Sequence, residues 1–161
     1  MATNKDTEKK NYAKHDSYAL AYEMISTAIR RNFPLQAIAV EESIISDRLW
    51  SALNASKPTG GKKETLGRAL EEWKRLIKIG ISFPLGEEAE TMRENLVRWW
   101  DSRNKLIHGI VKSFRGEKPK IAAANFERSA MKAAAKGLEL AKQVCNWSHK
   151  QILKTRKDGV K

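Results

Sequence analysis

The chain has 161 residues, of which 41% are hydrophobic and 31% are charged, as expected for one soluble globular domain. It carries 31 lysines and arginines against 19 aspartates and glutamates, and the resulting net charge of +12 favours a polyanionic partner such as nucleic acid. The single cysteine, Cys145, excludes an internal disulfide, and no apolar run is long enough to span a membrane.

The first sixteen residues are polar throughout and lack the apolar centre of a secretory signal. We therefore expect a flexible polar leader over residues 1–16 and a cytoplasmic protein. The first helix is predicted over residues 17–32, where apolar residues recur at three- and four-residue spacing. The second is predicted over residues 34–55, because proline is tolerated in the first turn of a helix and Pro34 precedes an apolar repeat.

Three further helices follow a segment rich in glycine, proline and lysine, SKPTGGKKE. They are predicted over residues 64–79, 87–111 and 121–154, and a basic loop, KSFRGEKPK, separates the last two. The predicted fold is therefore all-α, a four- to five-helix bundle, with residues 17–157 as a single domain and residues 158–161 as a basic tail. Tryptophans 50, 73 and 147 occupy core-like positions and are expected to pack.

Polar residues interrupt the apolar side of the helix predicted over residues 87–111. At about 100° per residue, Arg103 falls inside the arc formed by Leu96, Trp99, Trp100, Leu106, Ile107, Ile110 and Val111. Asn104 and His108, four residues apart, are stacked along the edge of that arc. A guanidinium in an apolar stripe is costly unless another group pairs with it.

Three interpretations of this pattern are open. In a structural one, Arg103 pairs with Glu41, Glu42 or Asp47, and His108 binds a backbone carbonyl. In a second, the arc is an interface between two copies of the chain, to which one of the adjacent tryptophans, 99 or 100, contributes. In a third, the site performs phosphate chemistry, in which arginine binds the anion and histidine transfers protons.

The segment RNKLIHGIV resembles the R-x(4–6)-H signature of the HEPN superfamily, in the form R-N-x-x-x-H made by Arg103, Asn104 and His108. The predicted architecture is also similar, with the motif near the end of the penultimate long helix. The resemblance implies a HEPN-like bundle that cleaves RNA without a metal or other cofactor, at a composite active site across a homodimer. Toxin and host-defence effector are the roles it implies.

The resemblance also implies residue roles. His108 of each copy would act as acid or base, and Arg103 would clamp the phosphate oxygens. Asn104 would orient His108 or donate to the phosphate, and the product would carry a 2′,3′-cyclic phosphate. An antitoxin or regulatory protein is a further candidate partner, although Ile110 stands where one toxin branch has a nucleotidylated tyrosine.

Basic residues around the motif are candidates for binding the RNA backbone, namely Lys105, Lys112 and Arg115. The alternative function is a noncatalytic helical adaptor that binds RNA or protein. The remaining histidines, His15 and His149, do not stand at metal-ligand spacing from cysteine or carboxylate residues, so no metal is expected.

Overall fold

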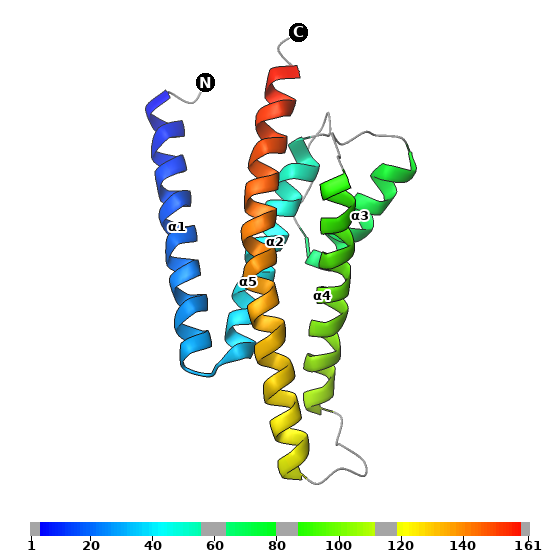
Figure 1. The fold of residues 1–161 in the computed structure, drawn as a ribbon. Coiled ribbons are helices and arrows are strands. Elements are labelled where there is room, and N and C mark those ends of the chain that lie inside the picture. The colour runs from blue at the N-terminus through cyan, green and yellow to red at the C-terminus, as the bar shows by residue number, and fades with distance from the viewer. Residues whose placement is uncertain (1–3, 56–63, 80–86, 112–118, 159–161) are drawn as a thin grey trace.

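The computed structural model describes residues 4–55, 64–79, 87–111 and 119–158, and these residues form five helices and no strand. The helices are α1 (Asn4–Arg30), α2 (Pro34–Ala55), α3 (Leu66–Lys78), α4 (Glu87–Val111) and α5 (Pro119–Asp158) (Figure 1). The prediction of an all-α bundle is confirmed. Over the described residues, none of these helices combines the length and the apolar character needed to cross a bilayer.

The observed helix bounds agree with the predicted ones for α2 and α4, differ by one or two residues at each end of α3, and differ more at the ends of the long terminal helices. Helices α2 and α4 have the predicted bounds, whereas α1 begins at Asn4 instead of near Ser17. The stretch expected as a leader is therefore helical from Asn4 onward. From Asn4 to Asp16 it contains no glycine or proline and has four lysines, a residue type that favours helix without producing an apolar repeat.

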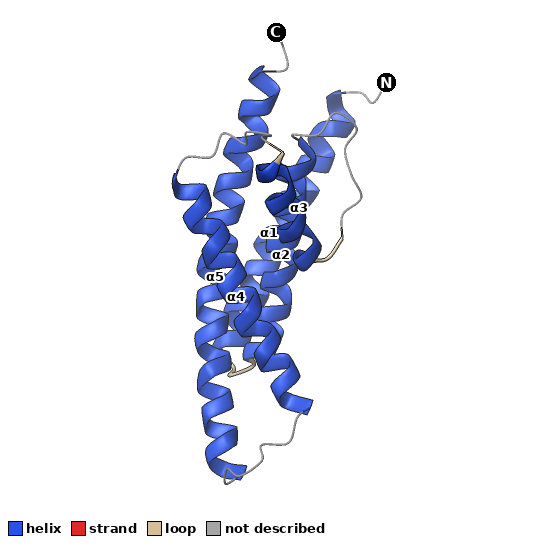
Figure 2. Ribbon diagram, turned by 90° about the vertical axis from the view of Figure 1, so that its right-hand side faces the viewer, coloured by secondary structure: helices blue, strands red, loops and turns tan. Residues whose placement is uncertain are grey.

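Helix α2 lies at the centre of the bundle. It packs most extensively on α5 and also contacts α1 and α3, while α4 packs along α5 in the antiparallel direction (Figures 1 and 2). A tight turn connects α1 to α2: Asn32 adopts a left-handed conformation with φ of 59°, and the amide of Phe33 donates to the carbonyl of Ala28 at 2.8 Å. This is the Schellman arrangement, in which asparagine is the commonest substitute for glycine.

The core is formed by aliphatic and aromatic side chains from all five helices. Its largest fully buried members include Ile25, Ile38, Ile45, Leu49, Leu53, Trp73, Leu76, Leu96, Leu140 and Val144. The packing role predicted for tryptophans 50, 73 and 147 is confirmed, since Trp50 and Trp73 are buried and Trp147 is stacked on Trp73 with ring centroids 5.0 Å apart.

Both members of the Trp99–Trp100 pair pack within the chain. Trp99 is buried and its indole N–H donates to the carbonyl of Ala133 at 2.8 Å. Trp100 is half-buried against Gly67 of α3, where an added Cβ would lie 2.8 Å from the indole. Helices α3 and α5 thus accommodate both indoles, and a contribution of the half-buried Trp100 to a subunit interface stays a prediction.

A carboxylic acid lies within this core. Glu41 of α2 is fully buried, and neither of its carboxyl oxygens has a hydrogen-bond partner among the described residues. Burial raises its pKa to about 8, so the group is neutral when folded near pH 7. Gly137 of α5 makes room for it, because a Cβ there would overlap Glu41 Oε2 and lie 2.8 Å from the indole of Trp99.

We expect Gly137→Ala to lower the free energy of unfolding by about 1–3 kcal/mol, because the methyl group would overpack a site bounded by buried side chains. Gly109→Ala is the matched control, since a Cβ at this helical position meets nothing within 4 Å. It should be neutral or stabilising by up to about 1 kcal/mol. Urea denaturation measures both, and equal stabilities for the two variants would contradict the close approach of α5 to Glu41.

Glu41 also makes stability depend on pH. The raised pKa means that the folded state binds more protons than the unfolded state between about 4.5 and 8, so stability falls as pH rises through that window. Between pH 5 and pH 7, Glu41 should lower the free energy of unfolding by roughly 2–3 kcal/mol. The variant Glu41→Gln should lose this dependence in urea denaturation across the same pH range. An unchanged pH profile in the variant would show that Glu41 is ionised when folded.

Candidate functional site

Arg103 faces α2 from the apolar side of α4. Its guanidinium forms an ion pair through Nη2 with Glu42 of α2, and Nη1 donates to Asn104 Oδ1 at 2.8 Å. The two charged side chains are only 24% and 20% exposed. The prediction that Arg103 pairs with a carboxylate from another helix is thus confirmed for Glu42, and the guanidinium is held at two points.

The other two carboxylates considered as partners have different environments. Glu41 points into the core, as described above. Asp47 accepts a hydrogen bond from the Tyr18 hydroxyl of α1, and burial together with this bond raises the pKa of Tyr18 above its usual value. Helix α2 therefore directs one carboxylate towards α1, one into the core and one towards α4.

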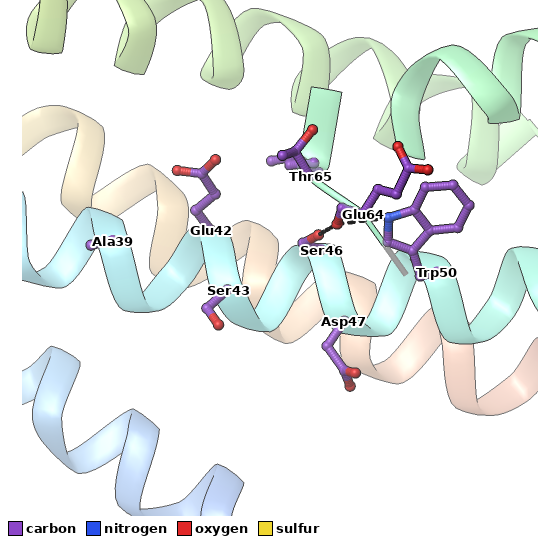
Figure 3. Close-up of a pocket in the computed structure, with 9 residues that line it drawn as sticks. Ala39, Glu42, Ser43, Ser46, Asp47, Trp50, Glu64 and Thr65 are labelled. Carbon is purple, nitrogen blue, oxygen red and sulfur yellow. Dashed lines mark hydrogen bonds between the residues drawn. The ribbon is translucent and has the colours of Figure 1, made fainter. Parts of the chain in front are cut away.

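Glu42 also borders a hollow between α2 and the start of α3, with a volume of about 380 Å³ (Figure 3). The Ser46 hydroxyl and the Trp50 indole donate to the carbonyl of Glu64 at 3.1 and 3.0 Å, and Thr65 caps α3. These contacts fix the start of α3 beside Glu42. Because the glutamates Glu42 and Glu64 line the hollow, it is unfavourable for a phosphate group.

His108 lies on the outer side of α4. Its side chain is exposed and makes no hydrogen bond within the part of the chain that the structure describes, so the expected bond to a backbone carbonyl is not found there. It follows Arg103 by five positions on the helix, equivalent to a rotation of roughly 140° and a rise of about 7.5 Å. Within one chain, Arg103 therefore faces α2 while His108 faces outward.

The remaining predicted site residues lie around this pair. Asn104 is half-buried and binds Arg103. Lys105 is exposed and borders a hollow between α4 and α5 that Phe126 also lines. Lys112 and Arg115 lie outside the described residues. The structure thus brings Arg103, Asn104 and Glu42 together and leaves His108 and Lys105 on the open side of α4.

Comparison with known proteins supplies no relative: no family model matches the chain, and no curated protein or solved structure matches it. Among the residues with described side chains, no group of three or more histidine, cysteine or carboxylate residues is arranged to hold a metal ion.

Arg103 and Glu42 should have a large coupling energy, because both side chains of this ion pair are shielded from water. A double-mutant cycle of Arg103→Ala and Glu42→Gln should give a coupling energy of about 1–3 kcal/mol in urea denaturation. Arg98→Ala and Glu94→Gln form the matched control, since this pair joins successive turns of α4 with its side chains 74% and 50% exposed. Its coupling should be about 0.3–0.5 kcal/mol. Equal coupling in the two cycles would contradict the shielding of Arg103.

Proposed function

We propose that the protein is a metal-independent endoribonuclease of the HEPN type that acts as a homodimer, in the role of a toxin or host-defence effector. One observation carries the proposal: His108 is exposed and unpartnered within the described residues, on the same helix as an arginine that Asn104 and Glu42 hold in place. The net charge of +12 supports RNA as the substrate.

The chemistry needs an acid, a base and a cation. In RNA cleavage the 2′-oxygen attacks the adjacent phosphorus after losing its proton to a base, and the 5′-oxygen leaves with a proton from an acid. The products are a 2′,3′-cyclic phosphate and a 5′-hydroxyl. Imidazole can fill either proton-transfer role near neutral pH, and guanidinium stabilises the negative charge on the non-bridging oxygens.

The geometry of α4 supports a two-copy site. Because Arg103 and His108 point in directions roughly 140° apart, one chain cannot readily direct both groups at the same phosphorus. A two-fold axis beside the outer side of α4 would place two copies of His108 on opposite sides of a bound phosphate. A phosphate that reached Arg103 would compete with Glu42 for the guanidinium, whose Nε is buried and has no hydrogen-bond partner among the described residues.

A noncatalytic RNA-binding adaptor is the second candidate, and the Arg103–Glu42 ion pair favours it. A guanidinium that a carboxylate already neutralises contributes less to the binding of an anion. In this alternative, Arg103 joins α4 to α2, and the exposed Lys105 contacts RNA without cleavage.

The two candidates differ in what happens to mixed RNA in the presence of EDTA. We expect the wild-type protein to cleave it, and we expect His108→Ala to lower the rate at least about 100-fold because general acid–base catalysis is lost. His149→Ala is the matched control, since this histidine is also exposed but lies on α5. Cleavage by His108→Ala at the wild-type rate would overturn the nuclease proposal, and thermal unfolding would verify that each variant is folded.

A further inference from the structure

A second hollow between α4 and α5 lies at the opposite end of α4 from Arg103. Its volume is about 580 Å³. The residues that define its chemistry are Met92 and Asn95 of α4, with Gln143, Asn146, Trp147 and Lys150 of α5. The antiparallel packing of the two helices brings these residues together, although they are about fifty positions apart in the sequence (Figure 1).

Three primary amides line this hollow. The side chains of Asn95 and Asn146 make no hydrogen bond within the described part of the chain. Gln143 donates to Glu139 at 3.0 Å, which leaves its carbonyl oxygen as an acceptor. A primary amide presents a donor beside an acceptor, and the edges of nucleobases carry the same pattern, which asparagine and glutamine read in pairs of hydrogen bonds.

The hollow also has an aromatic wall and a cation. Trp147 is half-buried and is held by stacking on Trp73, so its indole is already ordered before a ligand binds. Lys150 is exposed one turn further along α5. None of the residues lining the hollow is a carboxylate, and the nearby Glu139 is paired with Lys136 at 2.8 Å. Among the side chains that the structure describes, an anionic ligand in this hollow therefore meets Lys150 and no lining carboxylate.

We propose that this hollow binds one nucleotide of single-stranded RNA. The base lies against Trp147, Asn95 and Asn146 read its edge, and Lys150 binds its phosphate. This assignment rests on the proposed action on RNA. It extends that proposal by placing a nucleotide-binding anchor, formed by Asn95, Asn146, Trp147 and Lys150, away from the phosphate that reacts.

The position of the anchor relative to the motif fits one continuous strand. Ser102, which borders the other α4–α5 hollow together with Lys105, follows Asn95 by seven residues, or about 10 Å along the helix. A strand anchored between Asn95 and Lys150 can therefore run along α4 towards Lys105 and the outer side that carries His108.

Calorimetric titration with an unlabelled eight-nucleotide single-stranded RNA tests the anchor. The titrations use His108→Ala protein in EDTA, so that binding is measured without cleavage. We expect Asn95→Ala and Asn146→Ala, each added to this background, to weaken binding about tenfold, because each removes hydrogen bonds to the base.

Lys150→Ala is compared with Lys142→Ala, which removes the same charge from an exposed position of α5 outside the hollow. Lys150→Ala should weaken binding about tenfold and Lys142→Ala at most about twofold. Titrations with the four nucleoside 5′-monophosphates and with ribose 5-phosphate separate base recognition from phosphate binding, and only the nucleotides should bind.

The proposal is overturned if Asn95→Ala and Asn146→Ala bind the RNA as tightly as Lys142→Ala. Binding of ribose 5-phosphate as tight as that of the nucleotides would equally exclude a base site. These outcomes are independent of the cleavage assay. RNA binding that depends on Asn95 and Asn146, in a protein that does not cleave RNA, would support the anchor and exclude the nuclease. RNA cleavage that depends on His108, with binding that does not depend on Asn95 and Asn146, would support the nuclease and exclude the anchor.

Discussion

The ion pair between Arg103 and Glu42 links α4 to α2, the helix at the centre of the bundle. Arginine in an apolar stripe must find an acceptor, and Glu42 provides one at the point where α4 approaches α2. Once Arg103 faces α2, the 3.6-residue repeat directs His108 and Lys105 away from the bundle. The same rotation of α4, which also buries Met92, Leu96 and Trp99, shields the guanidinium and exposes the imidazole. The motif is thus divided, with Arg103 facing inward and His108 facing outward. An active site formed by two copies of the chain would follow from this division.

Glu41 and Glu42 illustrate how adjacent residues of one helix acquire opposite electrostatic roles. Glu42 is charged and paired with Arg103, whereas Glu41 is enclosed beside Gly137 and Trp99 and has its pKa raised to about 8 by burial. A neutral acid in the core contributes no attraction to Arg103 or to RNA. The carboxylate that matters for the candidate site is thus the partly shielded Glu42, while Glu41 affects the stability of the bundle.

Apolar periodicity and helix-end residues are sufficient to predict much of this fold. Pro34 and the repeat that follows it mark α2, and the motif helix α4 also has its predicted bounds. The start of α1 could not be located in this way, because a polar helix that extends beyond the packed core has no apolar repeat. The need of Arg103 for a carboxylate follows from its position in the stripe, but the choice of Glu42 over Glu41 or Asp47 depends on the register between α2 and α4. The hollow around Asn95 and Asn146 was missed because its two sides come from different helices and neither side carries a motif.

The most direct test of the two-copy site is the distance between the outer sides of α4 in solution. Asp101 is exposed and lies about two turns before His108 on the same side of the helix, so a spin label there reports on that surface. In a Cys145→Ser background, an Asp101→Cys protein carrying the label should show dipolar coupling between two copies, and dilution with unlabelled protein should reduce that coupling. The absence of coupling in a folded protein, or a monomeric mass at the concentrations at which RNA is cleaved, would contradict a shared active site.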